Sequence, residues 1–106
     1  MGVRILANEI SEEDVWDTLS NVMHPEIDSS LVELGMIRDV TVKENKVTVV
    51  LALPFLGVPI RDYLVGLIRE TVMKLGVEIE VKLVEMIPEE LQAFLNMERE
   101  KWKGQK

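Results

Sequence analysis

One short segment of the sequence carries residue types that could do chemistry. His24, Glu26 and Asp28 alternate within the polar stretch His24–Ser30. In an extended chain alternate side chains point the same way, and one imidazole with two carboxylates can bind a divalent metal ion. The simpler interpretation is a solvated loop in which Pro25 sets a turn and Asp28 caps a neighbouring group. We expect the solvated loop, and we keep a metal-dependent enzyme built on these three residues as an alternative.

The chain contains no cysteine and one histidine. Disulfides, thiol nucleophiles, Cys-ligated zinc and thiolate-held iron–sulfur clusters are therefore excluded within a single chain. A site that needs two imidazoles is excluded in the same way. The sequence also lacks the Walker lysine motif, the nucleophile elbow and the HExxH motif of standard hydrolases. We therefore expect no enzymatic activity, no bound cofactor and no metal site.

A second unusual segment is Pro54–Pro59, which has six consecutive residues without one polar side chain. Loops usually lie on the surface and are polar, so this loop is either buried or part of an interface. The first expectation is that it closes the core, with Phe55 partly buried against the helix layer and Leu56 exposed beside Gly57. The alternative is a surface that binds a partner protein or a second copy of the chain.

Periodic apolar residues around these loops predict the elements that position them. Ser11 and Asp14 form a capping box at the start of the first helix, Pro59 can open the second helix as its first residue, and Gly76 can end it. Asn45 tolerates the left-handed conformation that a tight hairpin turn needs. The predicted helices span residues 12–23, 59–75 and 88–103, and the predicted strands span residues 36–43, 46–53 and 77–83.

This order, α-β-β-α-β-α, predicts a two-layer α+β fold. We expect a mixed three-stranded sheet with helices on one face, in which the third strand runs parallel to the second. The 106 residues form one domain, with a core over about residues 11–84 and an extra C-terminal helix over about 88–103. The sequence shows neither a membrane-spanning apolar run nor a signal peptide, so we expect a cytoplasmic protein.

The formal net charge of −7 bears on the choice of partner. Nucleic-acid binding relies on Lys and Arg side chains that neutralise phosphates, so we expect protein partners and no nucleic acid. KH-type RNA-binding modules mix helices and strands in a similar order, and such a module is kept as an alternative. It would need a GxxG loop and a basic groove, whereas Gly57 is the one glycine of the candidate loop.

Three segments in the same order resemble a known family. They are His24-Pro25-Glu26-Ile27, the stretch from Val32 to Val40, and Gly57-Val58-Pro59 at the start of a helix. They are similar to the SufT/PaaD-like iron–sulfur assembly domain, long catalogued as a domain of unknown function. The resemblance runs from about residue 11 to residue 84, and its most specific part is the family's DLG-I-x-D-V signature, which is seen here from Glu33 to Val40.

The resemblance implies an α-β-β-α-β fold and a role in maturing iron–sulfur proteins, sometimes fused or coupled to a P-loop carrier ATPase. The chain departs from the family at several motif positions: threonines expected just before the Gly-Val-Pro segment appear as Ala52 to Phe55, and the Pro-Pro-Trp near the family's C-terminus is missing. His24 stands where the family usually has the Asp of an Asp-Pro-Glu motif, and Val58 stands where it usually has the Cys of a Gly-Cys-Pro motif. Several other motif residues are retained, namely Pro25, Glu26, Gly35, Asp39 and Pro59.

The matching scaffold and the missing cysteine together predict an accessory or adaptor protein in iron–sulfur (metal–sulfur) cluster assembly. It would act by protein–protein contact through the loops Pro54–Pro59 and His24–Asp28. The expected partner is an assembly scaffold or a P-loop carrier ATPase, with homodimerisation as a further option. The candidate binding residues are His24, Pro25, Glu26, Glu33, Gly35, Asp39, Gly57, Val58 and Pro59, and the candidate interface residues are Phe55 and Leu56.

Overall fold

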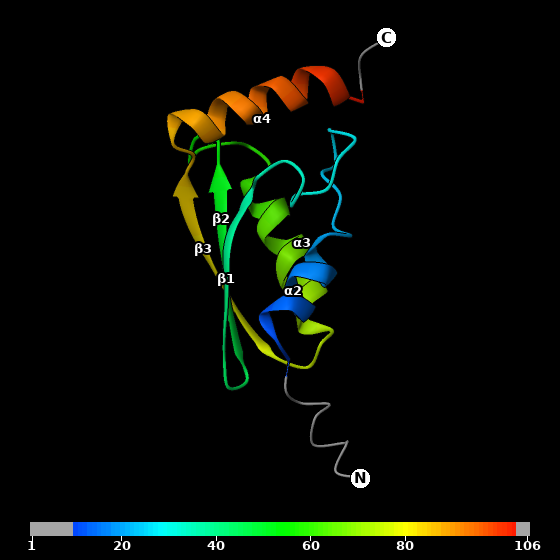
Figure 1. Ribbon diagram of the computed structural model, residues 1–106, viewed down its shortest axis with the longest axis vertical. Coiled ribbons are helices and arrows are strands. Elements are labelled where there is room, and N and C mark those ends of the chain that lie inside the picture. Colours follow the sequence, from blue (N-terminus) through cyan, green and yellow to red (C-terminus); the bar gives the residue numbers. More distant parts are fainter. Residues whose placement is uncertain (1–9, 104–106) are drawn as a thin grey trace.

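The structure is a computed structural model in which residues 10–103 are described (Figure 1). Its elements follow the predicted order α-β-β-α-β-α. They are α2 (Glu12–Leu19), β1 (Ile37–Lys43), β2 (Lys46–Leu53), α3 (Arg61–Met73), β3 (Glu78–Glu85) and α4 (Pro88–Lys101). No helix in this part of the chain is both long enough and apolar enough to cross a membrane.

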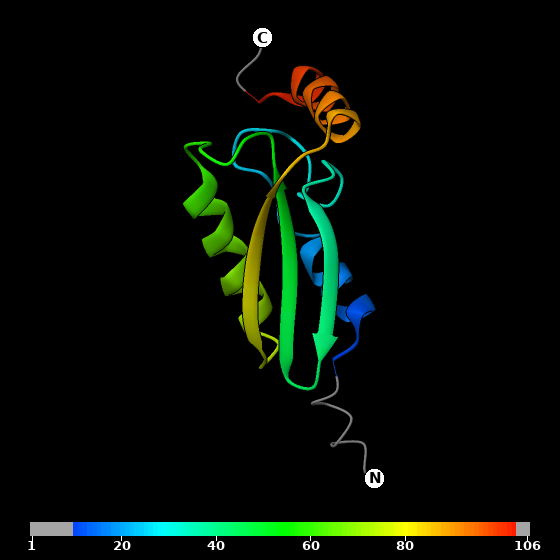
Figure 2. The same ribbon diagram turned by 90° about the vertical axis from the view of Figure 1, so that its left-hand side faces the viewer.

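The strands form one mixed sheet in the order β1-β2-β3. β1 pairs with β2 in antiparallel fashion, and β2 pairs with β3 in parallel fashion, so the expected parallel third strand is confirmed. Helices α2 and α3 lie on the same face of the sheet, as Figure 2 shows. The chain reaches β3 from β2 through α3, which is the long connection that a parallel pair needs.

The core lies between this sheet face and the two helices. Val47, Val49, Leu51 and Leu53 of β2 are all fully buried, as their alternation predicts. Each helix buries residues along one side. The fully buried residues are Val15 and Leu19 of α2 and Leu64, Ile68 and Val72 of α3. The opposite sheet face is more polar and includes an ion pair between Lys46 and Glu80 at 3.2 Å.

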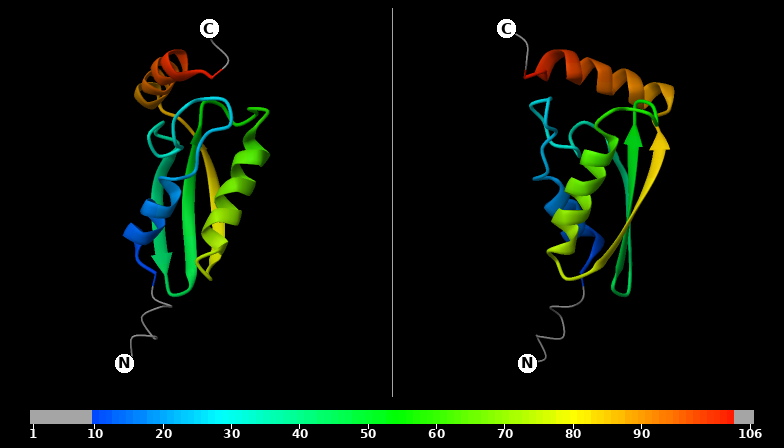
Figure 3. Two further views of the ribbon diagram at one scale, coloured as in Figure 1. Left: turned by 90° about the vertical axis from the view of Figure 1, so that its right-hand side faces the viewer. Right: turned by 180° about the vertical axis from the view of Figure 1, so that it is seen from behind.

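Helix α4 does not join this helix layer. It lies across the end of the sheet at which β2 and β3 finish, as Figures 1 and 3 show. Its C-terminal end is tied to the segment after α2, because the Asp28 amide donates to the Lys101 carbonyl at 2.8 Å. The Lys103 amide likewise donates to the Glu26 carbonyl at 3.0 Å. These bonds hold α4 above the loops at that end of the molecule.

The end of the first helix and the conformation of the hairpin turn differ from the predictions. The capping box of α2 is confirmed, with the Asp14 amide donating to Ser11 Oγ at 3.0 Å. The helix ends at Leu19 rather than residue 23, because the next amides make tighter bonds, such as that from Asn21 to the Thr18 carbonyl. In the hairpin, Glu44 rather than Asn45 has the positive φ, 57°.

Two further boundaries differ around α3 and β3. Helix α3 begins at Arg61 and not at Pro59, because the Arg61 amide first donates to the Val58 carbonyl at 3.0 Å and closes a turn. Strand β3 continues to Glu85, two residues beyond the predicted end, because its parallel register pairs Glu85 with Leu53, the last residue of β2.

Candidate functional site

A pocket of about 280 Å3 lies at the end of the molecule that α4 covers. Three segments form most of its wall: the turn that begins at His24, the loop between β2 and α3, and helix α4. We call it the loop pocket. Its lining residues are His24, Glu26, Met36, Pro54, Phe55, Val58, Pro59, Ile60, Leu64, Phe94, Leu95 and Glu98. Apolar side chains therefore form most of the wall, with one imidazole and two carboxylates among them.

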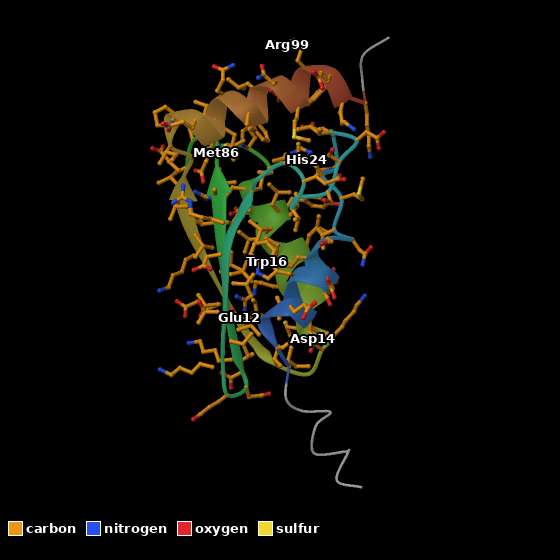
Figure 4. All side chains as sticks on the ribbon, in the orientation of Figure 1. Glu12, Asp14, Trp16, His24, Met86 and Arg99 are labelled. Atoms are coloured by element: carbon orange, nitrogen blue, oxygen red, sulfur yellow. The ribbon has the colours of Figure 1, made fainter. Side chains whose placement is uncertain are left out.

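His24 is the buried polar residue of this wall. Its side chain is 4 % exposed and lies below α4 in Figure 4. The ring Nδ1 accepts hydrogen bonds from the backbone amides of Glu26 at 3.0 Å and Ile27 at 3.2 Å. A ring nitrogen that accepts carries no proton, so the neutral ring carries its proton on Nε2. The sequence folds into this turn because the side chain replaces a backbone acceptor for two amides.

The protonation of His24 follows from its surroundings. Burial lowers the pKa of the imidazole below its ordinary value of 6.5, and nearby Lys103 acts in the same direction. The Glu26 carboxylate opposes them, but its effect is smaller than that of burial. The ring is therefore neutral at pH 7, and its Nε2–H is a hydrogen-bond donor.

The loop between β2 and α3 forms the second wall, and it is exposed. The side chain of Phe55 is 53 % exposed and that of Leu56 is 43 % exposed. The expected burial of Phe55 against the helix layer is therefore wrong, whereas the expected exposure of Leu56 is confirmed. The core is closed at this end by Phe94 of α4, which is 4 % exposed. The loop is held from outside, since Arg61 donates to the Leu56 carbonyl at 3.2 Å and the Leu56 amide donates to Glu85 Oε2 at 3.3 Å.

Helix α4 supplies the third wall through Phe94, Leu95 and Glu98. The sequence predicts a helix over about residues 88–103 but does not assign its residues to the site. The missing information was the position of the helix across the end of the sheet. In the sequence, the apolar loop Pro54–Pro59 was the one sign that another element packs near it. A loop without polar side chains needs an apolar neighbour.

The structure brings together some of the predicted site residues and separates others. His24, Glu26, Phe55, Val58 and Pro59 line the loop pocket. Pro25, Leu56 and Gly57 belong to the same two loops, but they do not line it.

Three predicted residues have local structural roles away from the pocket. Glu33 closes a reciprocal turn, accepting from the Ser30 amide at 3.0 Å while its own amide donates to Ser30 Oγ at 3.0 Å. The Ser30 bond lowers the pKa of the Glu33 carboxyl. Gly35 ends that turn with φ 75°, where a side chain would be strained. Asp39 accepts from the adjacent Val40 amide at 2.9 Å.

The arrangement of the alternating trio His24, Glu26 and Asp28 differs from the one expected for a metal site. Asp28 lies outside the loop pocket, beside the last residues of α4 and Trp102. The chain turns at His24 instead of running extended, so alternation does not place the three side chains together. Among the described residues, no group of three or more His, Cys, Asp or Glu side chains could hold a metal ion. The metal-site interpretation of this trio is therefore wrong.

Arg38 is a structural residue that sequence reasoning missed. Its guanidinium forms an ion pair with Glu90 of α4, with Nε 3.2 Å from Oε2, and donates to the Glu85 carbonyl at 3.1 Å. The pair raises the pKa of Arg38 and lowers that of Glu90, which also accepts from the Ile87 amide at 3.0 Å. This contact fixes the start of α4 against β1 and so positions the roof of the pocket.

The side chains that line the pocket are suited to binding a partner group. Val58 stands half-buried in the wall and offers no thiol. The one nitrogen base, His24, uses its basic Nδ1 to hold the backbone turn. A neutral donor, apolar walls and two carboxylates can recognise an apolar group that carries a polar or cationic end.

Comparisons with known proteins agree with this fold. The family model described as iron-sulfur cluster assembly protein matches residues 12–86. An iron-sulfur cluster carrier protein of Synechocystis sp. is 36 % identical over 83 residues, which cover 76 % of this chain. The match covers 24 % of that protein, so the chain spans about a quarter of the length of this relative.

Two solved structures share the fold. A domain of unknown function, DUF59, from Bacillus anthracis superposes with a TM-score of 0.68 at 24 % identity, covering 87 % of this chain and 95 % of that one. A Mycobacterium tuberculosis protein associated with Fe–S complex assembly and repair gives a TM-score of 0.53 at 21 % identity, covering 77 % and 83 % of the two chains. The family model covers most of the described residues, and the chain therefore belongs to the iron-sulfur cluster assembly protein family.

Proposed function

We propose that this chain is an accessory or adaptor protein of iron–sulfur cluster assembly, and that it acts by protein–protein contact instead of ligating a cluster. Membership of the family supports the pathway. The mode of action is inferred from the residues. The chain has no cysteine, and iron–sulfur clusters are held chiefly by thiolates, so a cluster would be carried by another protein.

The observation that carries this proposal is the exposure of Phe55 and Leu56 beside the loop pocket. Both are large apolar side chains with about half of their surface in solvent, at 53 % and 43 %. Apolar residues gathered at one exposed site mark interaction surfaces more often than singly scattered ones do. The pocket next to them provides a place for an anchor residue, which is how a few side chains supply most of the affinity of an interface.

The expected partner is an assembly scaffold or a P-loop carrier ATPase. The Synechocystis relative is named as a carrier protein, and this chain spans about a quarter of its length. We infer that a separate protein carries the cluster, and that this chain assists that carrier by binding to it. The proposal includes no enzymatic activity, a cytoplasmic location and, as a further option, self-association through the same loop.

Affinity capture from the native host tests this function. The bait is the full chain as wild type, as Phe55→Ser with Leu56→Ser, and as Tyr63→Ser, a matched control on α3 that is 56 % exposed and lies outside the loop pocket. We expect an assembly ATPase or cluster scaffold to bind the wild type and the control, and to be lost with the loop variant. Capture of no assembly protein, or equal capture by all three baits, contradicts the proposal.

A further inference from the structure

We propose that the loop pocket binds a tyrosine side chain presented by a basic, lysine- or arginine-containing segment of the partner protein. This inference rests on the proposed function and names the chemistry of the partner. Three properties of the pocket lead to it, which are its size, its one free donor and its unpaired carboxylates.

The size of the pocket fits one large side chain. Its volume of about 280 Å3 lies just below the range of roughly 300–1,000 Å3 in which drug-sized ligands bind. Phe55, Leu64 and Phe94 supply apolar wall from three separate segments, so a ring inserted between them would contact carbon on several sides. Aromatic side chains are the usual anchors in such pockets, because they bury a large area and have few rotatable bonds.

The hydrogen-bonding capacity of His24 selects among the aromatic residues. Its Nδ1 is occupied by the two backbone amides and the residue lines the pocket, so we infer that Nε2–H is the donor that the ring offers there. Ser29 Oγ is the one fully buried side-chain polar atom without a partner among the described residues. No described residue bonds to His24 Nε2, yet Nε2 is not among the fully buried atoms without a partner. Nε2 is therefore not fully buried, and a bound group can reach it. A tyrosine hydroxyl can accept from Nε2–H, whereas an indole N–H can only donate and phenylalanine has no polar atom.

The carboxylates around the pocket favour a basic segment. Glu26 and Glu98 line the pocket, and Glu85 lies beside the loop, bonded to the Leu56 amide. None of the three forms a salt bridge with another described residue.

Two basic groups lie near the same site. Arg61 is paired with Asp62 at 3.1 Å, and Lys103 is close enough to act on His24. The whole chain is nonetheless acidic, with a net charge of −7. Lysine or arginine residues next to the anchoring tyrosine would complement the rim, and such complementarity speeds association and fixes the register of binding.

The test is an NMR titration of the full chain with three acetylated, amidated tripeptides: Lys-Tyr-Lys, Lys-Phe-Lys and Glu-Tyr-Glu. We expect Lys-Tyr-Lys to shift the amide signals of residues 26–27 and 55–60 with a Kd on the order of 1 mM, as befits a short flexible probe. Lys-Phe-Lys should bind roughly two- to ten-fold more weakly, because it lacks the acceptor for Nε2–H. Glu-Tyr-Glu should give no saturable shift.

A pair of variants locates the binding site. Glu98→Gln should weaken Lys-Tyr-Lys binding roughly two- to five-fold, as expected for one partly exposed charge pair. Glu100→Gln is the matched control on the same helix, since Glu100 lies outside the loop pocket, and it should leave the affinity unchanged.

Equal binding of Lys-Phe-Lys overturns the assignment of tyrosine, and equal binding of Glu-Tyr-Glu overturns the assignment of a basic segment. If no peptide shifts the pocket signals while Phe55→Ser with Leu56→Ser still loses its assembly partner, this inference fails and the proposed function stands. If Lys-Tyr-Lys binds the pocket but no assembly protein depends on the loop, the proposed function fails and the pocket chemistry stands.

Discussion

His24 shapes one wall of the loop pocket because its side chain serves as a backbone acceptor. Two amides, those of Glu26 and Ile27, point at Nδ1, and the ring is buried. Protonation of Nδ1 would turn this acceptor into a donor that faces two other donors. The neutral ring is therefore part of the folded structure, and the turn at His24 is linked to pH.

The pKa of His24 gives a prediction about stability in mild acid. The folded-state pKa is lowered from 6.5, so the unfolded chain binds more protons as the pH falls through that value, and the free energy of unfolding decreases. We expect urea titrations to show stability falling between about pH 6.5 and 5, a window above the region in which carboxylates titrate. His24→Asn, which keeps a side-chain acceptor, should remove this dependence. An unchanged pH profile in the variant would contradict the account.

Val58 provides a test of whether the pocket is open. Val58→Cys places at this position the residue that the family usually carries, and a half-buried Cys behaves as a small hydrophobe. We expect the free energy of unfolding to change by less than about 1 kcal/mol. The thiol should react completely with iodoacetamide in the folded protein, but more slowly than free cysteine, because Glu26 and Glu98 line the same pocket and disfavour the thiolate. Labelling that requires unfolding would mean that the pocket is closed.

At the scale of elements, the pocket is made by segments that are distant in the sequence. The family model ends at residue 86, whereas α4 begins at Pro88, so the roof of the pocket lies beyond the matched segment. Arg38 holds the start of α4, and the backbone bonds of Asp28 and Lys103 hold its end. The two loops and the helix are therefore positioned together.

The loop between β2 and α3 should contribute to binding and not to folding. Because Phe55 and Leu56 are exposed, Phe55→Ser and Leu56→Ser should each change the free energy of unfolding by less than about 1 kcal/mol. Phe94→Ala is the contrasting variant, and it should cost about 3–5 kcal/mol because it opens a cavity in the core. Denaturant titration measures all three. A large loss at Phe55 or Leu56 would show that the loop is packed in the core.

Local signals in the sequence predict much of the fold. Strand β2 runs from Lys46 to Leu53 as predicted, because an alternating pattern and flanking turn residues agree. Ser11 caps α2 for a similar reason, since both partners of the box are local.

The site was less predictable, because it depends on contacts between distant segments. The burial of Phe94 in place of Phe55 is decided by where α4 crosses the sheet. The separation of Asp28 from His24 is decided by a turn that the imidazole itself closes. Neither contact leaves a periodic signal, whereas the family motifs pointed to four of the lining residues, which are His24, Glu26, Val58 and Pro59.

At the scale of the whole molecule, the protein belongs to an iron–sulfur assembly family but contains no cysteine. Anaerobic reconstitution with iron and sulfide should leave the isolated protein colourless, because carboxylates and one imidazole replace thiolates poorly for soft metals. Absorbance spectra with iron and sulfide analysis check this result. A stoichiometric cluster on the chain alone would contradict the adaptor mode.

The most direct test of the central claim is the activity of an iron–sulfur enzyme in a host from which this chain has been deleted. The deletion is complemented with the wild type, with Phe55→Ser and Leu56→Ser together, or with Tyr63→Ser, each confirmed to accumulate equally. We predict that the wild type and Tyr63→Ser restore the activity and the cluster content of the enzyme, whereas the loop variant restores neither. Full restoration by the loop variant, or no loss of cluster content on deletion, would contradict the claim that this protein serves cluster assembly through its exposed apolar loop.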